Sequence, residues 1–546
     1  MAIISAIREL VSAQNAVLYC LIPSVILYLV NALFLTPPLP KGIALIREPP
    51  GKTSFSLKTR WAYLTNCEAI FREAYQNYAK KGHAVLIPGF GIRTELILPT
   101  KSLRWALSQP DHILSTWDAF AEIDQTHYSL GDEKYVSDPW QGNLVKKELN
   151  AILDTVVSAL GQELSVAFDE YFGTDEENWS EIELEKAVGM VVAQAASRFS
   201  VGLPLCRNKV YLHATLSAIN GLVLNAGITG GTPAILRPLI GRLAGLQCHI
   251  AQERVKKHFK PLYESRLQTL RYPPDDRNHT EPQDHLQLML RFAQRERPDE
   301  VYDFDTMSRR LTAINFGSMH QTSIQVTNML LNILGSDGEF DTVRVLREEI
   351  ADVLEPADEV DAKNWTKANI AKMIKADSVA RETLRCHSFS GRAVFRKVMV
   401  DGVVTDTGVS LPKGTIISFL GQPAHLDEAV YADPTKYDPF RFSRAREAAS
   451  LPAADENNNS NTNNKTSFVS TGPDFLPFGH GKHACPGRFL IDFELKMIIA
   501  YVLTNYEMRF PEGYGGERPP NRWLAEALFP PAGVKVLVKR RREGKE

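Results

Sequence analysis

The strongest local signal in the sequence is at residues 478–487, Phe-Gly-His-Gly-Lys-His-Ala-Cys-Pro-Gly. These residues stand directly before a helical pattern at residues 488–503. Gly479 and Gly481 allow tight backbone turns, and Gly487 removes a side chain at a point where a flat ligand would come close. A cysteine within such a glycine-rich turn, ahead of a helix, predicts a loop that presents its sulfur to a bound group.

The sulfur of Cys485 is the group that this loop would present. Backbone amides in the loop can point at the sulfur, and the positive end of the helix that follows favours a thiolate over a thiol. A thiolate held in this way suits an axial bond to a haem iron. The alternative interpretation is a buried cysteine in a glycine-rich turn without a ligand.

Composition excludes several classes of protein. The chain has 546 residues, of which 44% are hydrophobic, so it can bury a large core. Lysine and arginine (62) nearly balance aspartate and glutamate (64), so the chain lacks the positive field that nucleic-acid binding requires. The six cysteines form no close pair, which is typical of a reducing compartment rather than of a disulfide framework.

The N-terminal residues 1–40 are interpreted as a membrane anchor followed by a proline hinge. Residues 10–40 carry no charge, and residues 16–35 form an apolar run long enough to cross a bilayer as one helix. Cations are more frequent after this run than before it, which favours a cytosolic position for the rest of the chain. A cleaved signal peptide is the alternative.

Hydrophobic periodicity in residues 41–546 predicts one domain that is mainly α with small β-sheets. A helix is expected from a cap at Thr65 or Asn66 to Lys80. Further helices are expected at 144–160, 305–334, 370–386 and 488–503, and strands at 84–87, 94–98, 394–400, 403–406 and 415–420. The asparagine-rich residues 445–473 predict a disordered insertion.

Glu382 and Arg385 share one face of a predicted helix and can form an ion pair. Arg441, in the segment Pro439-Phe440-Arg441-Phe442, could provide a second guanidinium to the carboxylate of Glu382 in a buried network. Such a network is stable only when every member is paired. The alternative is a solvated helix pair.

Taken together and in this order, these motifs resemble the cytochrome P450 superfamily of haem-thiolate monooxygenases over nearly the whole chain. In detail the chain is similar to membrane-bound fungal enzymes of secondary metabolism, because the stretch before the cysteine loop matches theirs at His425, Asp427, Asp433-Pro434 and residues 437–442. The resemblance implies a triangular-prism architecture behind one N-terminal transmembrane helix.

The resemblance also implies haem b as the cofactor, with Cys485 as the axial ligand to its iron. His483 is expected to contact one haem propionate, and Lys146 or Lys147 another, with plain surface lysines as the alternative. The remaining residues implied to surround the haem are Phe478, Gly481 and Gly487 of the cysteine loop and the folding and haem-pocket network Glu382, Arg385 and Arg441.

The long helix around residues 316–323 departs from the family pattern, in which an acid and then a threonine deliver protons to oxygen. Here His320 takes the position of the acid and Gln321 that of the threonine, while Thr322 lies one residue late and is expected to point elsewhere. Our first hypothesis is a relay in which Gln321 faces the oxygen and His320 titrates near neutral pH. The alternative is that His320 packs or caps a helix kink, and substrate hydroxyls supply the hydrogen bonds.

The expected function is oxidation of a lipophilic small molecule by dioxygen, in terpenoid, alkaloid or polyketide biosynthesis. NADPH would act only indirectly, through NADPH-cytochrome P450 reductase, with cytochrome b5 as a further electron donor. The resemblance implies an endoplasmic reticulum membrane protein with its catalytic domain in the cytosol and no nucleic-acid partner. The alternatives are a haem-thiolate enzyme for isomerisation, ring formation or dehydration, and a non-catalytic haem carrier or sensor.

Overall fold

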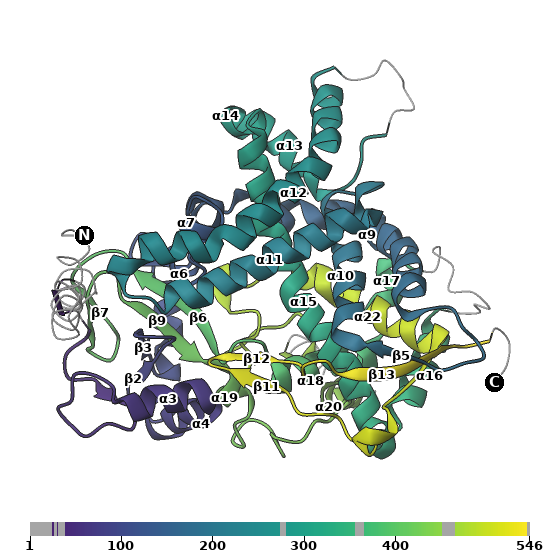
Figure 1. The fold of residues 1–546 in the computed structure, drawn as a ribbon. Helices are drawn as coiled ribbons and strands as arrows, with labels where there is room; N and C mark the ends of the chain where they lie inside the picture. Colours follow the sequence, from purple (N-terminus) through teal and green to yellow (C-terminus); the bar gives the residue numbers. More distant parts are fainter. Residues whose placement is uncertain are drawn as a thin grey trace, which may run out of the picture.

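The computed structural model describes residues 25, 26, 30, 39–272, 280–354, 365–449 and 465–542. Helices fill the upper and right-hand parts of Figure 1, and the largest sheet lies on the left. The long helices are α9 (Trp140–Phe172), α10 (Leu184–Ser200), α11 (Lys209–Gly230), α12 (Arg237–Arg271), α15 (Phe304–Phe340), α18 (Ile374–His387) and α22 (Arg488–Asn505). Shorter helices include α3 (Leu57–Thr65), α4 (Cys67–Ala74), α6 (Thr116–Ile123), α13 (His285–Glu296), α16 (Thr342–Leu354), α19 (Gly421–His425) and α20 (Arg441–Ala449).

The sheets are small, as predicted. The largest has the strand order β1-β2-β3-β9-β6-β4. Its strands are β1 (Ala44–Leu45), β2 (Val85–Pro88), β3 (Thr94–Ile97), β9 (Ile416–Leu420), β6 (Arg392–Val398) and β4 (Leu114–Ser115). In a second sheet, β13 (Lys535–Arg540) lies between β10 (Tyr506–Arg509) and β5 (Ser180–Glu183). Two further sheets have two strands each, β11 (Arg522–Leu524) with β12 (Ala527–Phe529) and β7 (Val403–Val404) with β8 (Ser410–Leu411).

Helix α15 crosses the body and joins the largest hydrophobic cluster, which it shares with α9, α10 and α22. The prediction that this helix stops at the glycines near residue 335 is wrong. It continues to Phe340 and ends where Asp341 adopts the left-handed conformation, with φ of 54°. A Cβ at Gly335 would lie 2.8 Å from the Cβ of Arg518, so this glycine allows a close contact inside the helix and does not end it.

The predicted helix at residues 66–80 is present in two parts. The side chain of Asn66 accepts a hydrogen bond from the amide of Ala69, which confirms the cap. The α-helical part ends at Ala74, and residues Tyr75–Ala79 form a π-helical turn. The sequence pattern gives the start and the end of this segment but not the change in its hydrogen bonding.

Two predicted segments lie largely outside the described residues. They are the apolar run at 16–35 and the middle of the insertion, 450–464. The ends of the predicted insertion belong to the folded body, because residues up to Ala449 continue α20 and Phe468 is fully buried. Among the described residues, the helical segment long and apolar enough to span a bilayer is Ala151–Phe172 of α9, which is more than half buried in the core.

Helices α11 and α12 pack closely because small residues line their contact. A Cβ on Gly221 of α11 would lie 2.7 Å from the backbone nitrogen of Cys248 on α12. Gly227, six residues further along α11, has no atom within 4 Å of such a Cβ. The two glycines therefore differ in packing while sharing one helix.

We expect Gly221→Ala to destabilise the protein by about 1–3 kcal/mol, because the new methyl group overlaps backbone atoms that cannot move freely. The control is Gly227→Ala, which should leave stability unchanged or raise it by about 0.5 kcal/mol through the lower chain entropy of alanine. Chemical unfolding of both variants measures the difference. Equal unfolding midpoints for the two variants would contradict this account of the helix contact.

Candidate active site

A cavity of about 460 Å³ lies between α15 and the loop that carries Cys485. Its walls come from α6, α10, α15, the chain that follows α18, strand β6 and the start of α22. Aromatic side chains line much of it, including Trp117, Phe120, Phe199, Phe389, Phe395 and Phe478. One side of the cavity is therefore formed by the loop with the sulfur of Cys485, and the other side by the middle of α15.

The cysteine loop turns in the way that its glycines predict. Gly479 and Gly481 both adopt positive φ, of 65° and 72°. The amide of Cys485 donates a hydrogen bond of 2.8 Å to the carbonyl oxygen of Phe478, which closes the loop. Glycine adopts such φ values without strain, so the sequence fixes this loop conformation locally.

The sulfur of Cys485 lies beside the first residues of α22, which begins at Arg488. Burial raises the pKa of its thiol, while hydrogen bonds from the amides of Gly487 and Arg488 and the charge of the Arg488 guanidinium lower it. These donors would stabilise a thiolate that is bonded to a cation.

The other described cysteines lack comparable surroundings. Burial raises the pKa of the thiols of Cys206, Cys248 and Cys386 to about 12. Burial also raises the pKa of Cys67. Cys67, Cys206 and Cys248 are buried and Cys386 is partly buried, and none of the four lines the cavity in the part of the chain that the structure describes.

Helix α15 faces the sulfur with Gly317, Ser318, Gln321 and Thr322, all of which line the cavity. The side chain of Gln321 is exposed to it, as the relay hypothesis requires. Thr322 also lines the cavity, contrary to the expectation that it points elsewhere, although it is only 7% exposed.

His320 does not line this cavity. Its ring lies edge to face with that of Phe389, at a centroid distance of 5.3 Å. Burial lowers the pKa of His320 to about 4, so the prediction that it titrates near neutral pH is wrong. The position agrees with the alternative that this histidine packs within the helix surroundings.

The basic side chains that line the cavity include His483, Arg392 and Arg396, and Arg392 is paired with Glu95 and Glu526. His483 places its Nε2 2.8 Å from Oδ1 of Asp111. Arg396 of β6 is 3% exposed and also lines the cavity, and it was not identified from the sequence. Its Nη1 donates to the carbonyl oxygen of Phe395, and it forms no ion pair with the residues described. Strand β6 also contains Arg392 and Lys397, so its sequence pattern does not single out Arg396.

Strand β6 brings Arg396 into the cavity through an irregularity. Its pairing with β9 changes register between Ala393 and Arg396, and Val394 has a φ of 54°. Side chains of a regular strand alternate between two faces, but here residues 393–396 all line the cavity. One strand thus supplies both an apolar wall and a buried cation.

Lys146 and Lys147 are exposed on α9 and do not line the cavity. The Nζ of Lys146 lies 3.3 Å from the carbonyl oxygen of Lys482 in the cysteine loop. The structure thus does not bring either lysine to the position predicted for a propionate partner, and the surface interpretation fits them. Their helix turns its apolar face inward, which leaves these polar residues outside.

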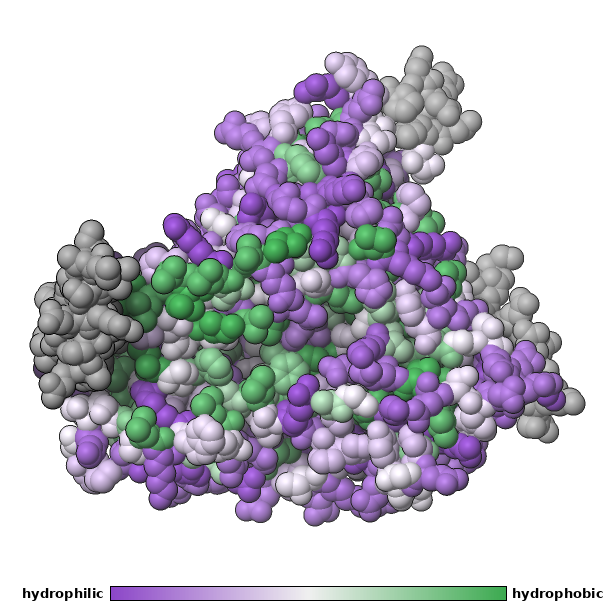
Figure 2. Space-filling model, viewed as in Figure 1, coloured by the Kyte–Doolittle hydropathy of each residue, from purple (hydrophilic) through white to green (hydrophobic). Residues whose placement is uncertain are grey.

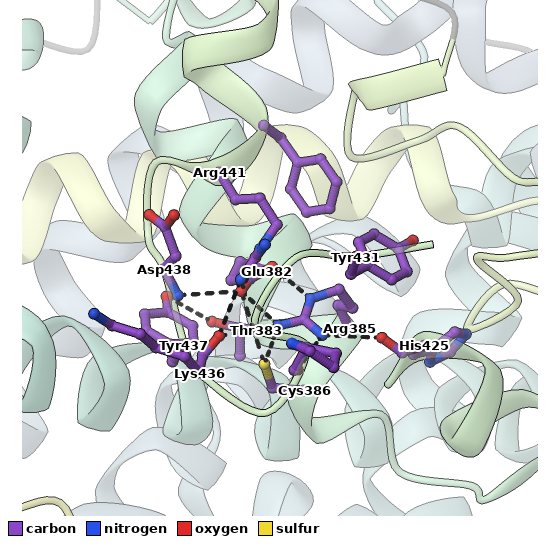
Figure 3. Close-up of polar contacts among 12 residues, drawn as sticks. Glu382, Thr383, Arg385, Cys386, His425, Tyr431, Lys436, Tyr437, Asp438 and Arg441 are labelled. Atoms are coloured by element: carbon purple, nitrogen blue, oxygen red, sulfur yellow. Dashed lines mark hydrogen bonds and ion pairs between the residues drawn. The ribbon is translucent and has the colours of Figure 1, made fainter. Parts of the chain in front are cut away.

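Glu382, Arg385 and Arg441 form the predicted buried network (Figure 3). Arg385 donates two hydrogen bonds of 2.7 Å to the carboxylate of Glu382, and both side chains are fully buried. Arg441 adds a contact of 3.1 Å, and the amide of Asp438 adds another. Every oxygen of the carboxylate is therefore paired, as a buried charge requires.

This network acts on the cysteine loop from a distance, because none of its three members lines the cavity. Arg385 also donates to the carbonyl oxygen of His425. Burial lowers the pKa of His425 to about 3, and its Nε2 accepts a hydrogen bond from the amide of Leu476, two residues before Phe478. Direct contact of the network with a cofactor is thus not supported, but it does hold the chain that leads into the cysteine loop.

The fold and this site define a helical enzyme whose cavity has one cysteine sulfur on its floor. The family model described as Cytochrome P450 matches residues 177–538, and the chain belongs to this family. It is 48% identical to the Cytochrome P450 monooxygenase pbrC of Penicillium brasilianum over 94% of each chain. Identity with the Cytochrome P450 monooxygenase astC of Aspergillus terreus is 48% over 92% of each chain. The protein is therefore an oxidoreductase of the P450 monooxygenase type.

A solved structure supports the fold independently. Retinoic acid-bound cyanobacterial CYP120A1 matches with a TM-score of 0.62, at 16% identity, over 92% of this chain and 100% of that chain. At this identity the likeness concerns the fold alone.

The family implies a haem with a cysteine thiolate ligand, and the cavity fits one. Haem offers an iron to a thiolate and carries acidic propionates. The cavity provides one sulfur with amide donors on its floor and a buried arginine without a carboxylate partner among the described residues at its edge.

We expect Glu382→Gln to cost about 3–5 kcal/mol of folding free energy, because it leaves a buried guanidinium without its counter-charge. The haem content of the purified protein should fall as the cysteine loop loses its support. The control is Glu348→Gln on α16, which breaks an ion pair between two largely exposed side chains and should barely change either quantity. Chemical unfolding and haem absorbance measure both, and a stable, haem-loaded Glu382→Gln protein would contradict the role of the network.

Proposed function

We propose that this protein is a haem-thiolate monooxygenase that inserts oxygen into a lipophilic small molecule. The observation that carries the proposal is the sulfur of Cys485, placed at the start of α22 and opposite the exposed side chain of Gln321 in one cavity. When bound, haem supplies the chemistry of dioxygen activation and of oxidation of an unactivated C–H bond.

The chain's own residues divide the remaining tasks. Cys485 would hold the metal as a thiolate, which the amides of Gly487 and Arg488 would stabilise. Arg396 and His483 are the residues placed to receive the acidic edge of the cofactor. Gly481 and Gly487 add no side chain at their own positions in the loop beside the cofactor.

Gln321 is proposed to order water next to the reacting oxygen. Its amide can donate and accept hydrogen bonds at once, so it can hold a water molecule without changing its own charge. Thr322 is the second polar residue of α15 available for this task. His320, which is neutral and turned toward aromatic rings, is not part of this relay.

Substrate class follows from the lining. The aromatic side chains of α6, α10 and β6 provide an apolar surface with few polar groups, which suits a lipophilic molecule. Relatives from fungi that are named cytochrome P450 monooxygenases support a role in secondary metabolism. We propose a terpenoid, alkaloid or polyketide as the substrate.

Electrons are proposed to come from NADPH through NADPH-cytochrome P450 reductase, with cytochrome b5 as a second donor. Residues 1–40 are proposed to anchor the protein in the endoplasmic reticulum membrane, so that the catalytic domain faces the cytosol beside the reductase. The absence of charge from residues 10–40 is the support for this anchor.

A second candidate function is isomerisation, ring formation or dehydration on the same haem. Glutamine in place of the family's threonine at residue 321 favours it. Turnover without dioxygen would establish this function, whereas a haem carrier or sensor would consume no NADPH in the presence of a reductase.

We expect Cys485→Ser to abolish both turnover and the thiolate-type Soret absorption of the reduced protein with carbon monoxide, because serine is a poor ligand for this iron. Cys67→Ala is the control, since this buried thiol lies in the sheet-side core and away from the cavity. A Cys485→Ser protein with an unchanged spectrum and unchanged turnover would disprove the proposed function.

We expect Gln321→Ala to lower the product formed per NADPH consumed by about threefold to tenfold, because water near the reacting oxygen loses a partner that orders it. The control is Ser318→Ala one turn earlier, whose hydroxyl donates to the carbonyl oxygen of Asn315 within the helix. Product analysis beside NADPH oxidation measures the ratio. An unchanged ratio in Gln321→Ala would exclude this residue from the relay.

A further inference from the structure

Three aromatic rings meet at nearly right angles on the α15 side of the cavity. His320 and Phe389 lie with their centroids 5.3 Å apart and an angle of 85° between the ring planes. Phe389 and Phe529 lie 5.3 Å apart at 86°, and His320 and Phe529 lie 6.5 Å apart at 84°. Each ring therefore presents an edge to another ring, which is the favoured arrangement for aromatic pairs.

Of these three rings, only that of Phe389 lines the cavity. The backbone around it is tied to the β11–β12 hairpin. The amide of Leu528 donates to the carbonyl oxygen of Phe389 at 2.8 Å, and the amide of Gly391 donates to that of Glu526 at 3.0 Å. These bonds fix the backbone of Phe389 but leave its ring to be oriented by side-chain contacts.

His320 and Phe529 supply those contacts from behind the cavity wall. Within the described part of the chain, the structure gives the imidazole of His320 aromatic neighbours and no hydrogen-bond partner. Its low pKa agrees with this apolar environment. A group without a polar partner is poorly suited to move protons but well suited to pack.

We propose that His320 is a positioning residue that holds the ring of Phe389 against the cavity, and so fixes the shape of the wall that a flat apolar part of the substrate would contact. The proposal rests on the proposed function, because it assigns a role within the same cavity. It makes His320 a determinant of substrate fit at the position where the usual family pattern has an acid.

The loss expected on removing the imidazole follows from ring packing. Aromatic edge-to-face pairs contribute enough to binding surfaces that loss of one changes affinity by about threefold to tenfold. Phenylalanine retains a flat ring of similar size, so His320→Phe should keep the contact, whereas His320→Ala should lose it.

Two ligands that bind haem iron distinguish an effect on the cavity wall from an effect on the cofactor. The probe is 4-phenylimidazole, whose imidazole binds the iron while its phenyl ring extends into the cavity, and imidazole itself is the internal reference. Titrations followed by the shift of the Soret band give both affinities for each variant. We expect the ratio of the two affinities to fall by about threefold to tenfold in His320→Ala and to stay within about twofold of the wild-type ratio in His320→Phe.

A double-mutant cycle tests whether His320 acts through Phe389. The ratio for His320→Ala/Phe389→Ala should equal that for Phe389→Ala alone, because the orienting contact has nothing left to orient. Phe120, which pairs with Phe395 on another wall of the same cavity, is the matched control, and His320→Ala/Phe120→Ala should show the product of the two single effects.

Several results would overturn the proposal. They are an unchanged ratio in His320→Ala, a fall in His320→Phe equal to that in His320→Ala, and independent effects of His320→Ala and Phe389→Ala. A drop in product per NADPH in His320→Phe as large as in Gln321→Ala would instead show that His320 carries protons.

Thermal unfolding keeps this test independent of the proposed function. His320→Ala should unfold at a lower temperature than His320→Phe whatever ligand the haem has, because the ring contacts belong to the protein alone. Failure of the proposed function would appear separately, as a wild-type spectrum with carbon monoxide that lacks the thiolate signature.

Discussion

The carboxylate of Glu382 is the constraint on which the site depends. A charge with no exposed surface is tolerated only when its hydrogen bonds are complete, and here two guanidinium groups and one backbone amide complete them. Arg385 donates a hydrogen bond to the carbonyl oxygen of His425, and the imidazole of His425 accepts one from the amide of Leu476. These bonds connect the carboxylate to the chain before the cysteine loop. The three charged members of this chain lie outside the cavity, whereas His425 and Leu476 at its end line the cavity and lead into the cysteine loop.

The two sides of the cavity are built by different forces. On the sulfur side, short hydrogen bonds and positive-φ glycines define one conformation of residues 478–487. On the side of α15, aromatic rings pack edge to face with one another beside aliphatic side chains. Directional bonds suit a cofactor that must always lie in one place, and apolar packing suits substrates that differ among related enzymes.

Local sequence predicted the features that depend on local physics. The cysteine loop, the cap at Asn66 and the pairing of Glu382 with Arg385 each follow from residue types at short spacing. Predictions failed for features that depend on contacts between residues distant in the sequence. Gly335 lies within α15 against Arg518, and His320 is neutral because it is buried, with Phe389 against its ring. Neither neighbour can be read from the pattern around the residue concerned.

The register change in β6 has a consequence for how this enzyme family can diversify. It places Phe395 and Arg396 in the same hollow although they are consecutive in the chain. Arg396 is the residue proposed to meet the cofactor, and Phe395 belongs to the apolar wall proposed to meet the substrate. A substitution at Phe395 can thus alter substrate specificity, while the adjacent Arg396 keeps its place beside the cofactor.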